Sequence, residues 1–67
     1  MKIESAADLG AAIRKRREAC GLTQTQFAEL LGATQQRVSM WETGVHPPPF
    51  ERLCEVLAAL SLTMRVQ

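Results

Sequence analysis

Apolar residues recur three or four positions apart in four segments of the chain, and residues typical of helix starts and stops bound each segment. This spacing predicts helices rather than strands, because residues three and four apart share one face of an α-helix. The predicted helices lie within residues 5–21, 23–32, 34–44 and 49–60. The pattern therefore predicts a compact all-α fold.

Polar residues at the predicted helix starts have the spacing of capping boxes. Ser5 is followed three residues later by Asp8, and Thr23 is followed three residues later by Gln26. Gly32 ends the second helix, where glycine allows the positive φ of a tight turn. The second and third helices are thus short, and the segment "GAT" joins them.

The fourth predicted helix follows a stiff connection, "VHPPP" at 45–49, because each proline pushes its predecessor toward extended backbone. Pro49 suits the first position of a helix. The side of this helix that is predicted to face the core carries the apolar residues Phe50, Leu53, Cys54, Leu57 and Leu60.

The tail "LTMRVQ" changes period, since Leu62, Met64 and Val66 alternate with polar residues. This alternation predicts a short β-strand over residues 62–67. A lone strand leaves its backbone groups unpaired, so its simplest partner is the same strand of a second copy, in an antiparallel ribbon that joins a homodimer. The alternative is a frayed tail.

Length and composition limit the class of protein. A chain of 67 residues is expected to form one domain, spanning residues 1–67, and its 46% hydrophobic and 22% charged residues are ordinary for a globular protein. No apolar run approaches the roughly 18 residues that cross a membrane, and the start lacks the apolar core of a signal peptide. The sequence therefore predicts no membrane contact and a cytoplasmic location.

Candidate catalytic or metal-binding residues are few. Cys20 and Cys54 lie far apart without a metal-ligand spacing, and both are expected to be small core residues. The single histidine, His46, has no nearby nucleophile or carboxylate pair. The sequence thus predicts no catalysis, no metal and no cofactor.

The net charge of +1 does not by itself indicate a nucleic-acid partner. A more specific signal is the pair of short helices joined by a glycine turn, which has the make-up of a helix-turn-helix over residues 24–43. Ala28 lies where the two helices would cross closely, and Val38 and Trp41 would pack the second helix onto the first.

The segment "LTQTQFAELLGATQQRVSMWETG" resembles the Xre/Cro family of bacterial and phage helix-turn-helix regulators, and the resemblance covers residues 9–60. It implies a lambda-repressor-like fold and binding to double-stranded DNA. The positions that match the family's pattern are Gln24, Ala28, Gly32, Val38, Trp41 and Glu42.

The start of the third helix carries the candidate base contacts. Residues at the N-terminal end of a helix in the major groove reach base edges, and Gln35 and Gln36 lie there. A glutamine amide matches the N6 and N7 edge of adenine. Ser39 and Met40 share that face, and Met40 could touch a thymine methyl. The segment "TQQ" is also similar to the recognition-helix start of lambdoid phage repressors, where glutamines read bases.

The family resemblance also implies contacts that position the protein on DNA. Gln24, at the positive end of the second helix, is expected to hold a phosphate and to brace Gln35. Because helix ends and backbone N–H groups need few lysines, the salt dependence of binding should be shallow. The further phosphate candidates are Thr23, Thr34, Arg37 and the backbone of Thr43, Gly44 and Val45.

The resemblance to phage repressors implies one structural ion pair. In those proteins an arginine in the first helix pairs with the glutamate at the end of the third, which here are Arg17 and Glu42. The neighbouring Arg14, Lys15 and Arg16 point to other faces and are expected to be solvated or to contact an outlying phosphate.

A four-helix body that ends in a strand is similar to the HipB-type antitoxins, whose operons encode a kinase-like toxin, and "IESAADLGAAIRKRRE" is similar to their leading segment. Two functions therefore compete. The first is a homodimeric repressor of an inverted-repeat operator. The second is an antitoxin or adaptor whose main role is to bind a kinase-like toxin, with DNA binding regulating its own operon.

Overall fold

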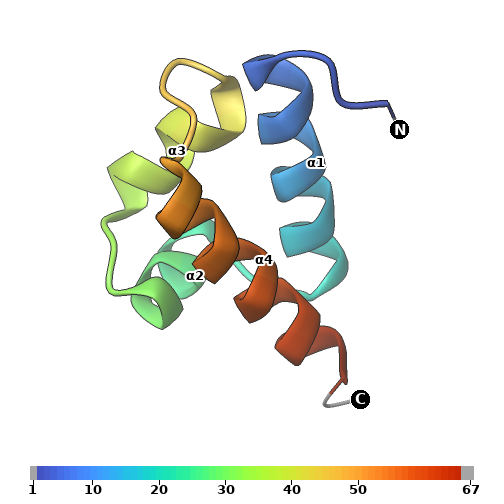
Figure 1. The fold of residues 1–67 in the computed structure, drawn as a ribbon. Helices are drawn as coiled ribbons and strands as arrows, with labels where there is room; N and C mark the ends of the chain where they lie inside the picture. The colour runs from blue at the N-terminus through green and yellow to red at the C-terminus, as the bar shows by residue number, and fades with distance from the viewer. Residues whose placement is uncertain (1, 66–67) are drawn as a thin grey trace.

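The computed structural model describes the backbone of residues 2–65 and the side chains of residues 2–61. In this part of the chain all the regular elements are helices, and they follow the predicted order (Figure 1). The all-α fold is thus confirmed. The four helices of the described chain are α1 (Ala6–Ala19), α2 (Gln24–Leu31), α3 (Gln35–Thr43) and α4 (Phe50–Arg65).

The helix starts follow the predicted caps closely. The Ser5 hydroxyl accepts a hydrogen bond from the Asp8 N–H (3.1 Å) and caps α1. The Asp8 carboxylate accepts from the N–H of Glu4 (3.0 Å), one residue before the partner that a capping box uses. At α2 the capping box of Thr23 and Gln26 is complete in both directions.

The turn between α2 and α3 is tight because Gly32 adopts the left-handed conformation, with φ of 65°. The Ala33 N–H donates to the Ala28 carbonyl oxygen (2.9 Å), and the Thr34 hydroxyl accepts from the Arg37 N–H (3.1 Å). These bonds end one helix and begin the next within three residues, which fixes the angle of α3.

The core lies where all four helices of the described chain meet. Trp41 of α3 is 2% exposed, and it packs in one cluster with side chains from α1, α2 and α4. Burying a large apolar side chain contributes about 1.5–3 kcal/mol, so this small cluster provides most of the drive to fold. Its members are Ile13, Phe27, Ala28, Val38, Trp41, Val56 and Leu60.

A close crossing brings α1 against the end of α3. Gly10 is buried at this crossing, and a Cβ added there would overlap the carbonyl oxygens of Trp41 and Glu42. Since those atoms belong to the backbone, a side chain at position 10 would push the two helices apart. The missing Cβ therefore sets the distance between α1 and α3.

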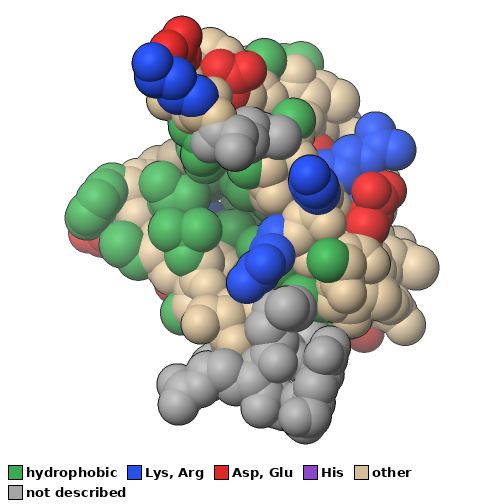
Figure 2. All heavy atoms as spheres, turned by 90° about the vertical axis from the view of Figure 1, so that its right-hand side faces the viewer, with side chains coloured by type: hydrophobic (Ala, Val, Ile, Leu, Met, Phe, Trp, Pro, Cys, Tyr) green, Lys and Arg blue, Asp and Glu red, His purple; other side chains and the backbone are tan. Residues whose placement is uncertain are grey.

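The predicted core-facing side of α4 is wrong in part. Val56 and Leu60 face the core, whereas Phe50 and Leu57 are 77% and 53% exposed and Cys54 is exposed. Apolar residues occur on nearly every side of this helix, so their spacing does not choose one face. Packing on the other three helices decides which side of α4 is buried. Figure 2 shows hydrophobic side chains gathered on the left-hand part of the surface in that view. We call Phe50, Cys54 and Leu57 the outer stripe of α4.

The predicted strand over residues 62–67 is also corrected. The helix α4 continues to Arg65, so the backbone at Leu62 and Met64 is helical, and Val66 lies outside the described residues. In a single chain a helix pairs its own backbone groups, whereas a lone strand has no neighbour for them. None of the helices in residues 2–65 combines the length and apolar character needed to span a membrane.

Candidate nucleic-acid interface

The first turn of α3 carries the two glutamines that the sequence predicts as base contacts. Gln35 and Gln36 are both exposed, and they directly follow the N-cap residue Thr34. The Thr34 hydroxyl caps α3 by accepting a hydrogen bond from the Arg37 N–H. A phosphate that binds Thr34 would have to use the hydroxyl's own proton. The open donors at this end are the side-chain amide of Gln36, the second side-chain N–H of Gln35 and the unpaired N–H groups of the first turn.

The other two predicted base contacts are less accessible. Ser39 and Met40 are both half-buried. The hydroxyl of Thr43 donates to the carbonyl oxygens of Ser39 (3.1 Å) and Met40 (3.3 Å), which tightens the last turn of α3. Any base contact from α3 therefore comes first from its N-terminal end.

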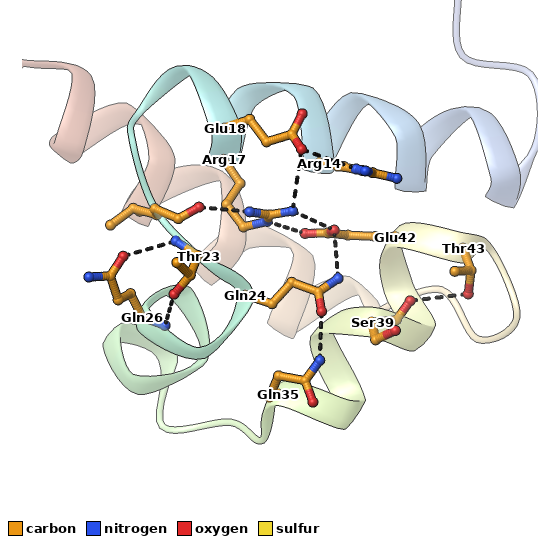
Figure 3. Close-up of polar contacts among 11 residues, drawn as sticks. Arg14, Arg17, Glu18, Thr23, Gln24, Gln26, Gln35, Ser39, Glu42 and Thr43 are labelled. Carbon is orange, nitrogen blue, oxygen red and sulfur yellow. Dashed lines mark hydrogen bonds and ion pairs between the residues drawn. The ribbon is translucent and has the colours of Figure 1, made fainter.

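Arg17, Glu42, Gln24 and Gln35 form a continuous series of hydrogen bonds, which we call the polar chain (Figure 3). Arg17 donates from Nε to Glu42 Oε2 (2.6 Å) and from Nη2 to Glu42 Oε1 (3.0 Å). Gln24 donates from Nε2 to Glu42 Oε1 (3.0 Å), and its own Oε1 accepts from Gln35 Nε2 (2.6 Å). The polar chain thus connects the interior of the domain to an exposed glutamine of α3.

The ion pair of the polar chain is buried, with side chains 8% exposed at Arg17 and 2% at Glu42. Arg17 also donates from Nη1 to the Leu22 carbonyl oxygen (2.7 Å) and so fastens the turn after α1. Its hydrogen bond to Glu42 raises the pKa of the guanidinium, more than burial lowers it. Because this pKa is raised, the positive charge of Arg17 stabilises the folded state. That stabilisation is lost only in strongly alkaline solution, as the pH rises through the pKa.

The start of α2 offers fewer open groups than the sequence suggests. The Thr23 hydroxyl accepts from the Gln26 N–H (3.0 Å), and the Thr23 N–H donates to Gln26 Oε1 (2.9 Å). Within the described chain the N–H groups of Gln24 and Thr25 have no such partner. Sequence reasoning missed Thr25, although a capping box indicates that the N–H groups between its two members stay open.

The connection after α3 was predicted to offer three backbone groups to phosphate. Thr43 lies inside α3, and the Gly44 N–H donates to the Trp41 carbonyl oxygen (3.3 Å). Val45 is 65% exposed, and its N–H lacks a partner among residues 2–65. Val45 is therefore the position of this stretch at which a phosphate could be held directly.

A pocket of about 350 Å³ lies beside the start of α3 and contains two arginines. Arg37 is exposed, while Arg52 donates to the Leu31 carbonyl oxygen (2.7 Å) and lies 6.0 Å from the centre of the Trp41 ring. Two guanidinium groups beside one helix start favour an anion such as phosphate. Sequence reasoning missed Arg52, because it lies between apolar positions. The pocket is lined by Gly32, Ala33, Thr34, Arg37, Trp41, Pro49 and Arg52.

The cysteines do not form a site. Cys20 is half-buried against the core, with its Sγ 3.8 Å from the Leu60 carbonyl oxygen, but Cys54 is exposed on α4. The expectation that both are core residues is thus wrong for Cys54, because α4 turns a different side inward. Within the described chain no three His, Cys, Asp or Glu side chains are grouped closely enough to hold a metal ion.

Two short capped helices, a glycine turn, a small residue at the crossing and an exposed polar helix start define a helix-turn-helix protein. A helix-turn-helix family model matches residues 13–66, and the chain belongs to this Xre/Cro-type family of DNA-binding regulators. No curated protein and no solved structure matches the chain.

Proposed function

We propose that this protein is a sequence-specific transcriptional repressor in the cytoplasm that binds DNA as a homodimer, with residues 1–67 as one domain and residues 24–43 as its helix-turn-helix. The observation that carries this proposal is the exposed pair Gln35 and Gln36 at the start of α3, with Gln24 bracing Gln35 from behind. An α-helix fits the major groove, and its N-terminal residues reach the base edges.

In this proposal Gln35 and Gln36 read bases by hydrogen bonds, and each good bidentate contact discriminates by about 1–3 kcal/mol. Met40 contacts a thymine methyl and Ser39 lies at the edge of the contact. Groups around these four residues hold DNA phosphates, and these contacts position α3 without reading the base sequence. These groups are the side chains of Gln24, Thr23, Thr34, Arg37 and Arg52 and the backbone of Thr25 and Val45.

A homodimer would place two copies of α3 in successive major grooves, about 34 Å apart, on an inverted repeat. Because α4 is helical to Arg65, the outer stripe of α4 is a better candidate interface than a paired strand. Phe50 and Leu57 are 77% and 53% exposed there, and a two-fold axis lets such a stripe pack on its own copy.

The interface is tested by measuring mass in solution for the full chain, for Leu57→Ser and for Glu51→Ser, which is exposed on the neighbouring polar side of α4. The expected result is a dimer that Leu57→Ser weakens and Glu51→Ser does not. A chain lacking residues 62–67 should still dimerise. If only that truncation abolishes the dimer, the tail and not the outer stripe joins the two copies.

The test of DNA recognition is selection from a pool of randomised duplexes at near-physiological salt. An inverted repeat with half-sites about one helical turn apart is expected. Gln35→Ala and Gln36→Ala should each lose preference at one position of the half-site, whereas Glu29→Ala, an exposed control on α2, should keep the full preference. If no sequence is enriched, the repressor proposal is wrong and the glutamines are ordinary surface.

The contacts to phosphate are tested by the salt dependence of affinity. With a net charge of +1 and contacts made largely by helix ends, the slope should be shallow. A slope that implies about ten or more neutralised phosphates per dimer would contradict this part of the proposal.

The exposed outer stripe of α4 also supports a second candidate function, an antitoxin or adaptor that binds a kinase-like toxin. In that case the stripe covers part of the toxin, and DNA binding regulates the operon. A neighbouring reading frame for a kinase-like protein, and a complex with its product that Leu57→Ser weakens, would favour this function. A lone dimer that binds DNA tightly would favour the repressor.

A further inference from the structure

The polar chain begins at a group that only accepts hydrogen bonds. Glu42 has a side chain that is 2% exposed, and an ionised carboxylate has no proton to donate. Arg17 donates to it twice, at 2.6 and 3.0 Å, and Gln24 donates once, at 3.0 Å. Each of the neighbours that contacts these oxygens has to present an N–H.

This requirement fixes the orientation of the Gln24 amide. The two ends of a glutamine amide have nearly the same shape, so packing alone does not choose between them. If the amide turned by 180°, Gln24 Oε1 would meet Glu42 Oε1, and two acceptors would face each other without a proton between them. Gln24 therefore keeps Nε2 toward Glu42 and Oε1 toward α3, as Figure 3 shows.

Gln35 takes its orientation from Gln24. Because Gln24 Oε1 can only accept, Gln35 has to turn Nε2 toward it, and the two atoms lie 2.6 Å apart. The Oε1 of Gln35 and its second N–H stay available at the exposed start of α3. An amide held in this way presents its donor and acceptor to a base pair in one order only.

The neighbouring Gln36 provides the comparison. It is also exposed on the same turn of α3, but within the described chain its amide has no hydrogen-bond partner. It can therefore turn by 180° and present its donor and acceptor in either order. The two adjacent glutamines thus differ in freedom although they have the same chemistry.

We propose that Glu42 is a positioning residue that determines specificity: through Gln24 it sets the order of donor and acceptor that Gln35 presents to DNA. Position 35 then reads its base strictly, and position 36 tolerates more than one base. Arg17 holds Glu42 in place and balances its charge. This inference rests on the proposed function of Gln35 in base recognition.

The proposed role of Glu42 is tested by Glu42→Gln, which keeps the shape of the side chain but replaces one carboxylate oxygen by an NH₂ group that donates. A donor at position 42 lets Gln24 turn around, so the series of amides can run in either direction. We expect the base preference at the position read by Gln35 to fall at least about fivefold, the lower limit of a bidentate contact. The preference at the position read by Gln36 should not change. Binding to duplexes with every base varied in turn measures both.

The matched control is Glu18→Gln. Glu18 also approaches Arg17, at 4.0 Å, but its side chain is 54% exposed and it has no bond to Gln24. Glu18→Gln removes the same charge near the same arginine. Because Glu18 does not contact Gln24, this variant should leave both base preferences unchanged. The proposal is wrong if Glu42→Gln keeps the strict preference, or if it weakens binding to all sequences equally, which indicates a structural role alone.

A measurement on the free wild-type protein keeps the proposal testable if Glu42→Gln does not fold. NMR couplings across hydrogen bonds should run from Gln24 Nε2 to the Glu42 carboxyl group and from Gln35 Nε2 to the Gln24 carbonyl. The Gln35 side-chain N–H protons should also exchange with water more slowly than those of Gln36. Equal exchange, or couplings in the opposite direction, would overturn the proposal.

These experiments separate the two proposals. If the wild-type protein enriches no DNA sequence, the proposed function fails, while the NMR couplings still decide whether Glu42 orients Gln35. If DNA is read but the couplings are absent, only the role of Glu42 fails.

Discussion

The surroundings of Gln35 and the outer stripe of α4 differ in how many of their side chains find partners within one chain. Around Gln35, polar groups from α1, α2 and α3 bond to one another and end in an ion pair with side chains 8% and 2% exposed. On α4, Phe50 and Leu57 remain 77% and 53% exposed. The first region is complete in a single copy, and the second has the character of a surface that binds another molecule.

The difference follows from the directionality of the two kinds of interaction. A carboxylate, a guanidinium and an amide each require a partner of a certain type in a certain direction. A motif that contains these groups therefore predicts which residues contact each other. Apolar side chains accept any apolar neighbour of suitable shape. Helix α4 is apolar on several sides, and only the assembled core decides which side is buried.

The largest expected effect is on the ion pair that starts the polar chain. Arg17→Ala leaves the carboxylate of Glu42 buried without its main partner, and losing one member of such a pair costs about 3–5 kcal/mol. Urea denaturation should show this loss. Arg16→Ala, an exposed neighbour on α1, should change stability by no more than about 0.5 kcal/mol. Equal midpoints for the two variants would mean that the pair does not stabilise the fold.

Two adjacent positions test which side of α4 faces the core. Val56 is 0% exposed and Leu57 is 53% exposed. Val56→Ala should cost about 2–3 kcal/mol from lost burial and the cavity that remains, whereas Leu57→Ala removes a larger side chain and should cost about 0.5 kcal/mol or less. Thermal unfolding of monomeric protein at low concentration measures both. The reverse order would restore the side of α4 that the sequence alone predicts.

The crossing of α1 and α3 is tested by Gly10→Ala. Alanine favours helices by about 1 kcal/mol over glycine, so helix propensity alone predicts stabilisation. The overlap with the backbone at Trp41 and Glu42 predicts the opposite, a loss of about 1–3 kcal/mol. The exposed neighbour gives the reference, since Ala11→Gly should cost about 1 kcal/mol. A higher melting temperature for Gly10→Ala would show that the crossing is not this close.

The smallest expected effect concerns the cysteines and leaves stability almost unchanged. Cys54 is exposed and Cys20 is half-buried, so a thiol reagent should label Cys54 first in native protein. If the outer stripe joins two copies, labelling of Cys54 should slow as protein concentration rises, while labelling of Cys20 should not depend on it. Slowing at both or neither would leave the stripe outside the interface.

The parts of the candidate site that were predictable depend on local spacing. The caps at Ser5 and Thr23 lie where the sequence places them, because a side chain that bonds to a backbone group three residues away needs no other element. The pairing of Arg17 and Glu42 followed from a family resemblance and not from spacing. Arg52 in the pocket had no sequence signal.

The sequence by itself determined the helices, their caps, the glycine turn and the exposed glutamines of α3, because these follow from interactions within a few residues of one another. Only the tertiary structure decided the side of α4 that is buried and the direction of the polar chain from Glu42 to Gln35. The reason is that each of these is a choice between arrangements with the same local pattern. Contacts between residues far apart in the chain make that choice.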